Sequence, residues 1–304
     1  MDKKLRQNYE KAGAIHQSAV AFAQKKLKPE TPLLGLAVEI EDFIFGRLKE
    51  EKLDGGLAFP LNLSLNNVAA HFTPGTGDKT VLGKDDVLKV DIGVHVKGCI
   101  ADGAFTFNYS NKHEKQIELN NSILQSGLDS IKVGSPISVV GNAIGKIMEK
   151  TDFKTIENLT GHGLGVYLQH DEPQIPNQPN NLKTKITDGM ALAIEPFVTT
   201  GRGFVAEASQ VEIFSIEEPK PVRDMNARKL LDVIGKHWPS LPFAERQLAK
   251  ETELSEFARK VGLRELSRNK ILHAYPVLQE QKDAIVTQSE KTVLIDGDEV
   301  KIIN

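Results

Sequence analysis

Apolar residues recur every three or four positions, with charged residues between them, in two stretches near the start of the chain, Lys4–Leu27 and Leu33–Glu51. This period predicts two amphipathic helices. Thr31-Pro32 supplies a start signal for the second helix, because proline is tolerated in the first helical turn. The same period predicts two further helices, over Glu114–Ile131 and Ile137–Lys150.

Runs rich in β-branched and aromatic residues predict strands after the first helix pair. Val87–Val96 and Cys99–Tyr109 predict a hairpin whose turn is Lys97-Gly98. A segment rich in glycine and histidine, Gly161–His170, then leads into a long loop with several Pro and Asn residues, which runs to Leu182. Strand-like runs return beyond it at Met190–Thr199 and Phe204–Phe214.

The pattern changes near Glu217–Pro221, where acidic and proline residues precede helical periodicity over Arg223–Arg268 with few strand signals. We therefore interpret residues 216–283 as a mostly helical insert in a main domain made of residues 1–215 and 284–304. Strand patterns resume in the last part of the chain, with Asp296-Gly297 as a predicted hairpin turn, over Ala284–Gln288, Lys291–Ile295 and Val300–Ile303.

Composition narrows the function without naming it. The chain of 304 residues is long enough for a sizeable core, and 40% hydrophobic and 26% charged residues are typical of a globular protein. A net charge of −3 gives no argument for a nucleic-acid partner or a membrane surface. A single cysteine, Cys99, excludes an intrachain disulfide and a zinc site built on thiolates. With no apolar targeting segment and no run of about 18 apolar residues, we expect a cytoplasmic protein.

Two aspartates on the predicted hairpin are the first candidate site. With the turn at Lys97-Gly98, Gly93 faces Asp102, so that Asp91 and Asp102 lie on one face as diagonal neighbours about 7–8 Å apart. Two uncompensated carboxylates in an apolar strand pair repel each other and lose their hydration, which a bound cation would resolve. The alternative is that one or both point into solvent or meet a lysine such as Lys84.

Three more candidates stand in unusual local contexts. His162 lies between two glycines that allow a close approach of a ligand, although a histidine there is often a hydrogen-bonded turn residue. Glu195 interrupts the apolar run Ala191–Phe197, as either a ligand or a salt-bridged structural acid. Glu290 is the weakest, because an exposed strand glutamate beside Lys291 would be unremarkable.

Four carboxylates and one imidazole form a ligand set for Mn, Fe, Co or Zn in a paired site rather than for a structural zinc. Carboxylates that bridge two ions about 3.5–4 Å apart lower the pKa of a shared water and polarise a carbonyl. The chemistry that this set indicates is metal-assisted hydrolysis.

Motifs spread over nearly the whole chain resemble those of type II methionine aminopeptidases of the archaeal, tail-free kind, within the pita-bread metallopeptidases. The matching stretches are Phe59-Pro60, Ser64–Asn66, Ala69–Pro74, Asp91–His95, Ala101-Asp102, Gly161-His162, Tyr167, His170, Ile175–Asn177, Ile194–Phe197 and Gln288–Glu290. The resemblance implies an α+β pita-bread fold, in which helices cover a curved antiparallel sheet. The helical insert resembles the subdomain that separates type II from type I enzymes.

The resemblance also implies a role for each candidate. Asp91 would chelate one ion, Asp102 and Glu290 would bridge both, and His162 and Glu195 would complete the other. A bridging hydroxide would attack the first peptide bond, with Glu195 as proton shuttle. The substrate would be contacted by His71 and His170, which help to stabilise the tetrahedral intermediate, and by Phe59 in a methionine pocket.

The implied activity is removal of the N-terminal methionine from nascent polypeptides, with a preference for small second residues and two divalent ions (Co, Mn, Fe or Zn) per chain. We expect a monomer with transient ribosome association, and no nucleic-acid or membrane partner. Three residues depart from the family pattern, namely Gln169, Ser289 and Lys291. Prolidase and aminopeptidase P, which share the ligand types, and a non-catalytic ribosome- or RNA-binding relative are the alternatives.

Overall fold

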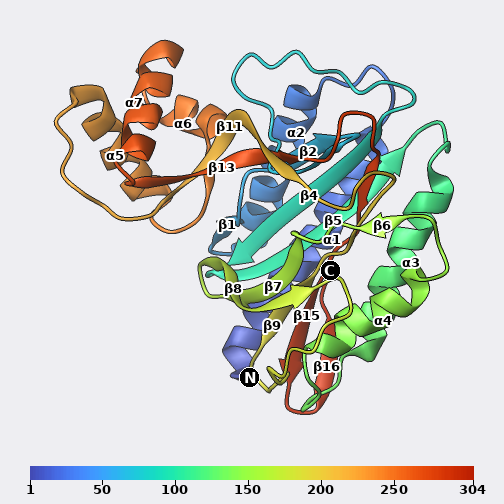
Figure 1. The fold of residues 1–304 in the computed structure, drawn as a ribbon. Helices are drawn as coiled ribbons and strands as arrows, with labels where there is room; N and C mark the ends of the chain where they lie inside the picture. Colours follow the sequence, from blue (N-terminus) through green and yellow to red (C-terminus); the bar gives the residue numbers. More distant parts are fainter.

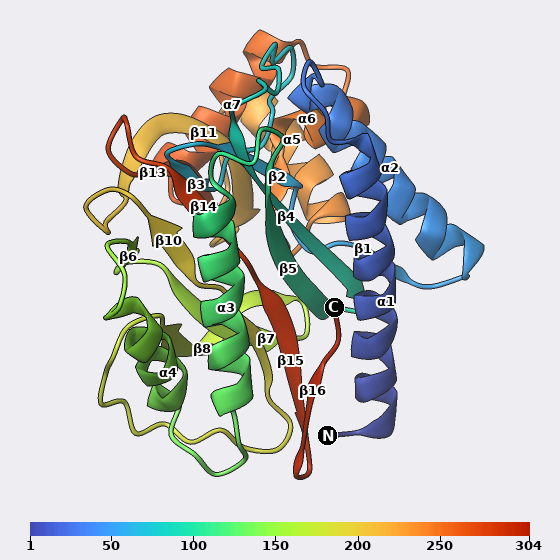
Figure 2. The same ribbon diagram turned by 90° about the vertical axis from the view of Figure 1, so that its right-hand side faces the viewer.

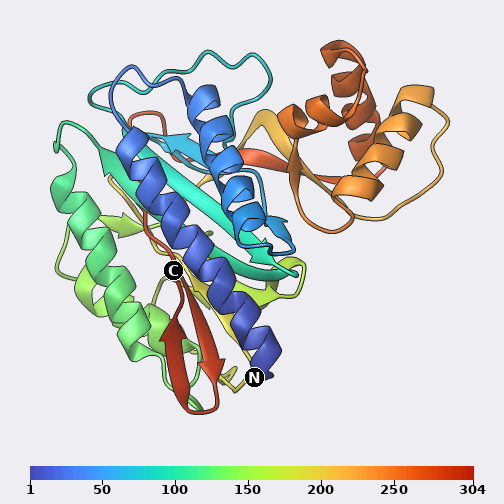
Figure 3. The ribbon, with the colours of Figure 1, turned by 180° about the vertical axis from the view of Figure 1, so that it is seen from behind.

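Helices lie on one side of curved antiparallel sheets, and a separate helical lobe projects from one end of the molecule, at the upper left of Figure 1. The computed structural model describes residues 1–304. The four predicted helices are confirmed as α1 (Lys3–Lys26), α2 (Leu33–Glu50), α3 (Glu114–Ser130) and α4 (Ser138–Met148). Seen from behind, α1 and α2 cover one half of the sheet surface, and α3 and α4 cover the other half (Figure 3).

Helix α1 shows why the periodicity was informative. Asp2 caps its start by accepting hydrogen bonds from the amides of Lys4 and Leu5, and Ile15 and Ala19 on its inner face are fully buried. This face packs on the hairpin of β4 (Val87–Val96) and β5 (Cys99–Asn108). No helix of the chain combines the length and the apolarity needed to cross a bilayer.

The predicted hairpin is confirmed in register as well as in position. Val96 pairs with Cys99 and Gly93 with Asp102, and Lys97 and Gly98 both adopt positive φ in the turn. On the side of β4 away from β5, β1 (Gly55–Leu57) and β2 (Asn62–Leu65) pair with it. The next strand in the chain, β3 (Val68–Ala70), belongs to another sheet.

Two parts of the second half differ from expectation. Gly161–His170 and the first part of the expected loop to Leu182 form a hairpin, β7 (Thr160–Gly165) and β8 (Leu168–Pro176), so the loop starts only after Pro176. The run Met190–Thr199 is interrupted at Glu195-Pro196, so that β9 (Ala191–Ile194) pairs with β7 while β10 (Phe197–Thr199) joins another sheet. A strand with a proline inside it loses a ladder hydrogen bond, and the break falls there.

The last strands return to the catalytic sheets between α1 and α3 (Figure 2). The hairpin turn lies at Gly297-Asp298, one position after the expected Asp296-Gly297, because Asp296 still pairs with Glu299. The last strands are β14 (Val286–Gln288), β15 (Lys291–Asp296) and β16 (Glu299–Ile302). A short strand from the middle of the chain, β6 (Lys154–Thr155), pairs with β10.

The lobe contains three helices around a small apolar core of its own, which includes Leu230, Phe243 and Leu266. Two strands within residues 216–283 were not predicted, the two-residue strand Phe243–Ala244 and a longer one. β13 (Leu272–Gln279) lies within residues 216–283 and pairs both with β11 (Ala206–Ile216) and with β3, so the helical part ends at Arg268. The remaining elements are α5 (Met225–His237), β12 (Phe243–Ala244), α6 (Glu245–Glu251) and α7 (Glu256–Arg268). The division into catalytic domain and insert stays a prediction.

Candidate metal centre

The aspartate pair lies where the register places it. Because Gly93 pairs with Asp102, Asp91 and Asp102 share one face of the β4–β5 hairpin. Asp102 is buried, and neither aspartate forms an ion pair, so the pairing with Lys84 and the solvent-facing alternative for Asp102 are wrong. One oxygen of each carboxylate, Oδ1, has no hydrogen-bond partner. Buried polar atoms are rarely left without partners, and two carboxylate oxygens on one face fit a bound cation.

Three other strands bring the remaining candidates to this face. His162 lies in β7 and pairs with Ala193 of β9, so Glu195, two residues further on, lies beside it, and Nε2 of His162 is 3.4 Å from Oε1 of Glu195. Glu290 lies in the break between β14 and β15, and its amide donates a hydrogen bond to the Ala104 carbonyl of β5 at 3.0 Å. The side chain of Glu290 is 2% exposed, so it is not the solvent-facing strand glutamate of the alternative.

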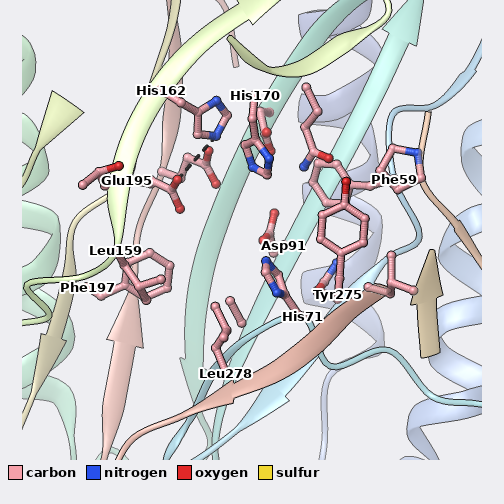
Figure 4. Close-up of a pocket in the computed structure, with 18 of the residues that line it drawn as sticks. Phe59, His71, Asp91, Leu159, His162, His170, Glu195, Phe197, Tyr275 and Leu278 are labelled. Carbon is pink, nitrogen blue, oxygen red and sulfur yellow. Dashed lines mark ion pairs between the residues drawn. The ribbon is translucent and has the colours of Figure 1, made fainter. Parts of the chain in front are cut away.

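The five candidates line one cavity of about 420 Å³. One ligand atom from each of Asp102, His162 and Glu290 lies within 4.8 Å of the other two. Figure 4 shows His162, Glu195 and Asp91 pointing into the same space, with the histidine and the glutamate joined by their contact. The structure thus brings together residues that are up to 199 positions apart in the chain, from Asp91 to Glu290.

Electrostatics make the cluster unstable without a cation. Burial raises the pKa of Asp91 to about 7. Burial and the repulsion of the neighbouring carboxylates raise the pKa of Asp102, Glu195 and Glu290 well above the ordinary range. Burial lowers the pKa of His162 to about 3, which keeps the imidazole neutral. Carboxylates bind a metal when deprotonated and imidazoles bind one when neutral. A divalent cation in the cavity would therefore stabilise the deprotonated carboxylates against their mutual repulsion.

The hydrogen bonds of the histidines define which ring nitrogen faces the cavity. Nδ1 of His162 lies 3.0 Å from the Gly163 carbonyl, and Nδ1 of His71 lies 3.1 Å from the Pro276 carbonyl. A carbonyl only accepts, so in each ring Nδ1 carries the proton and Nε2 keeps its lone pair. Burial lowers the pKa of His71 to about 4, so that ring is neutral as well.

Phe59, His71 and His170 line the same cavity. His170 packs edge-on against His162, with ring centroids 4.4 Å apart. Phe59 lies against Gly93, where a Cβ would be 2.2 Å from its ring, so only glycine leaves room for it. Four residues that the sequence did not single out complete the wall (Figure 4): Leu159, Phe197, Tyr275 and Leu278.

The three departures from the family pattern have different consequences. Gln169 lines the cavity, so it changes the polarity of the wall. Ser289 does not line the cavity; its hydroxyl donates to the Asn120 carbonyl at 3.1 Å. Lys291 does not line it either, and burial lowers the pKa of its ammonium group.

Supporting residues of the ligands were missed. Gln288 is 1% exposed, its Nε2 makes no hydrogen bond, and its amide offsets part of the rise in the pKa of Asp91 and Glu195. Thr292 and Asn304 hold the backbone of Asp102, because Thr292 Oγ1 and Asn304 Nδ2 both donate to the Asp102 carbonyl. Gln288 stands two positions from Glu290, which was a usable signal; nothing in the local sequence marks Asn304.

Solved structures share this fold. The structure of a thermophilic Arx1 superposes with a TM-score of 0.87 at 16% sequence identity, over 100% of this chain and 91% of that one. The methionine aminopeptidase of Rickettsia prowazekii superposes with a TM-score of 0.71 at 17% identity, over 100% and 98% of the two chains. At these identities the likeness shows the fold alone, which is the pita-bread fold that the resemblance implied.

Sequence comparison is more specific. Residues 7–218 match the model of metallopeptidase family M24. The chain is 40% identical to a methionine aminopeptidase of Pyrococcus abyssi over 95% of this chain and 96% of that one. It is 36% identical to a methionine aminopeptidase of Archaeoglobus fulgidus over 97% of both chains. The buried ligand cluster and these near full-length matches agree, and the chain belongs to metallopeptidase family M24, among its methionine aminopeptidases.

Proposed function

We propose that this chain is a metal-dependent aminopeptidase that removes the N-terminal methionine from polypeptides and favours small second residues. The observation that carries the proposal is the meeting of four carboxylates, of which Asp102 and Glu290 are fully buried, and a neutral imidazole in one cavity with two further neutral histidines. Curated relatives of nearly equal length are methionine aminopeptidases, which supports the substrate.

Membership of a metallopeptidase family implies a divalent metal cofactor. We assign Asp91, Asp102, His162, Glu195 and Glu290 as the residues that would hold it and expect two ions per chain, of Co, Mn, Fe or Zn. When bound, such a pair supplies an activated water and polarises the carbonyl of the first peptide bond. Carboxylate oxygens without other partners and an imidazole Nε2 with a free lone pair suit that donor set.

The chain's own residues then bind and orient the substrate. Since Nδ1 of His71 donates to the Pro276 carbonyl, its Nε2 is free to accept a hydrogen bond from a substrate N–H. His170 is open to the cavity and lies next to His162, where it can contact the reacting carbonyl group. Glu195 is the candidate that carries a proton from the attacking water to the leaving amine, a role that it would share with metal ligation, because its carboxylate lines the cavity beside His162.

The apolar part of the cavity fits the thioether side chain of methionine. Phe59 supplies an aromatic ring on one side of the cavity, and Leu159, Phe197 and Leu278 supply aromatic and aliphatic surface on the other (Figure 4). Methionine makes favourable contacts with aromatic rings through its sulfur, which a leucine or valine substrate cannot reproduce. Gln169 introduces an amide into the same wall, so we expect weaker discrimination against polar first residues than an aliphatic residue would give.

Proline-directed peptidases are the rival within the fold. The prolidase of Pyrococcus furiosus superposes with a TM-score of only 0.60 at 14% identity, whereas the curated relatives at 36–40% identity are methionine aminopeptidases. A monomeric state, a cytoplasmic location, transient ribosome association and the absence of nucleic-acid or membrane partners stay predictions.

The test is a peptide assay with Met-Gly-Pro and Ala-Pro-Gly, before and after chelation and after re-addition of Mn or Co. We expect cleavage of the first peptide only, lost on chelation and restored by metal. Cleavage of the second peptide alone contradicts the methionine assignment, and no cleavage with any metal contradicts the enzyme assignment. Asp102→Ala should lose metal and activity together, whereas the exposed Asp232→Ala serves as the matched control.

A further inference from the structure

The segment that carries His71 holds an unfavourable backbone. His71 has a φ of 64°, in the left-handed region that residues with a side chain seldom occupy. Such a conformation persists only where the surrounding structure over-determines it. The contacts of residues 71–76 therefore show what holds this histidine in place.

Three of those contacts come from the part of the chain between residues 243 and 279. The Pro276 carbonyl of β13 accepts from Nδ1 of His71 at 3.1 Å. Nη1 of Arg246, in α6, donates to Thr73 Oγ1 and to the Pro74 carbonyl. Thr76 Oγ1 donates to Glu245 at 2.6 Å. Helix α6 of the lobe thus holds Thr73, Pro74 and Thr76, and the neighbouring strand β13 holds His71.

Arg246 also reaches the segment that carries Phe59. Its Nη2 donates to Glu41 of α2, and the same carboxylate oxygen accepts the Leu61 amide at 3.2 Å. Thr73 Oγ1, which accepts from Arg246, donates in turn to the Leu61 carbonyl at 2.6 Å. One guanidinium therefore connects the two segments that place an aromatic ring and an imidazole in the cavity.

The network is dry. Arg246, Glu41 and Thr73 are 5%, 2% and 0% exposed. A buried ion pair is seldom more stabilising than apolar packing of the same volume, because both charges lose their hydration. Its directional hydrogen bonds, by contrast, define the relative position of the groups that they join. Stability alone therefore gives little reason for a guanidinium at this place.

We propose that Arg246 is a positioning residue for catalysis, which holds His71 and Phe59 in register with the metal centre through Thr73 and Glu41. The helical lobe then contributes to the active site although none of its helices lines the cavity. The inference rests on the proposed function, in which His71 binds the substrate.

Removing Arg246 alone leaves the charge of Glu41 buried without a counter-ion, so the test uses milder variants. Thr73→Val keeps the ion pair and removes the hydroxyl between the two segments, whereas Thr73→Ser keeps the hydroxyl. The double variant Arg246→Met with Glu41→Gln removes both charges together. Leu230→Ala, in the apolar core of the lobe and outside the network, controls for loss of stability alone.

Activity on Met-Gly-Pro and metal content are measured for each protein well below its unfolding temperature. We expect about a fivefold loss of kcat/KM for Thr73→Val, the effect of one hydrogen bond, and about 10- to 100-fold for the double variant, the effect of a displacement near 1 Å. Thr73→Ser and Leu230→Ala should stay within about twofold of wild type, and metal content should not change.

Combination with His71→Ala separates positioning from general damage. In that background the losses of kcat/KM caused by Thr73→Val and by the double variant should be clearly smaller than in the wild-type background, because one of the two groups that the network positions is gone. Equal losses in both backgrounds, or a loss for Leu230→Ala as large as for the double variant, would overturn the proposal.

A second measurement does not depend on activity. Imidazole nitrogen NMR should show His71 protonated at Nδ1 in wild type and in Thr73→Ser, and a mixture of tautomers in the double variant. An unchanged tautomer in the double variant also overturns the positioning role. If the wild type is inactive with every metal but the double variant still shows the change of tautomer, the proposed function is contradicted and the positioning role stays supported.

Discussion

Replacing Asp91, one of the proposed metal ligands, should make the metal-free protein more stable at neutral pH. Burial raises the pKa of Asp91 from 3.8 to about 7. In Asp91→Asn the side chain has nearly the same shape and never ionises. Without metal, the variant avoids the free energy that the wild type spends in keeping a carboxyl group protonated or in burying its charge.

The magnitude follows from the pKa difference. At about 1.4 kcal/mol for each tenfold change in proton affinity, a rise from 3.8 to about 7 lowers the free energy of unfolding by about 4 kcal/mol. Below pH 4 both states carry the proton and the cost vanishes. Between pH 4 and 7 the unfolded chain loses its proton first, so the wild type loses stability as the pH rises, and above pH 7 the full cost applies. Water in the cavity reduces this figure, so about 4 kcal/mol is an upper value.

The assay is denaturant unfolding of wild type and Asp91→Asn in the presence of a chelator, at pH 4.5, 6 and 8. The buried histidines His71 and His162, with pKa values lowered to about 4 and about 3, change stability in the opposite direction below pH 6.5. They are present in both proteins, so their contribution cancels in the difference. The stability gap should be smallest at pH 4.5, where about 1 kcal/mol remains, and largest at pH 8.

With Mn or Co present the order should reverse, because only the wild type gains the free energy of metal binding to a complete ligand set. A metal-free variant that is less stable than the wild type at pH 8 would refute the reasoning. So would a gap that does not change with pH, because it would show that Asp91 is ionised at little cost in the folded protein.

Three further substitutions test the cavity. Gln288→Leu removes the amide beside Asp91 and should weaken metal affinity about 10- to 100-fold, measured by competition with a chelator; unchanged affinity would show that Gln288 has no part in the centre. Gly93→Ala places a Cβ 2.2 Å from the Phe59 ring and should raise KM for methionine peptides about tenfold. The control Gly35→Ala, with open space around the new methyl group, should leave KM unchanged. Equal KM values for the two variants would exclude Phe59 from the pocket. Gln169→Ile should raise the preference for methionine over glutamine as first residue about tenfold in kcat/KM, and an unchanged ratio would mean that this wall does not contact the side chain.

The sequence carried its most accurate structural information where the chain folds back on itself nearby. Lys97-Gly98 sets the turn, and the turn sets the register of ten residue pairs. That register alone is sufficient to place Asp91 and Asp102 on the same face. The helices were equally local, because their apolar period needs no knowledge of the surface that they cover. Near full-length matches to known enzymes agree with the resemblance drawn from the motifs.

Tertiary structure decided which of the isolated candidates share a site. His162 had a local reading as a turn residue, and Glu290 one as an exposed acid; both readings fail because β7 and the β14–β15 break lie against the hairpin. Residues 272–279 were interpreted as part of a helical insert, yet β13 pairs with β3 and places a carbonyl on His71. Arg246 gives no signal in an amphipathic helix, where an arginine is ordinarily solvent-exposed.

The physical reason is the range of the interactions involved. Periodicity and turn chemistry depend on neighbours a few residues away, so the chain encodes them in short patterns. The desolvation of a carboxylate, the tautomer of a histidine and the partner of a buried guanidinium depend on atoms that come from distant segments, such as Asn304 beneath Asp102 or Glu41 beside Arg246. Those energies exist only after the sheets and the lobe have packed together.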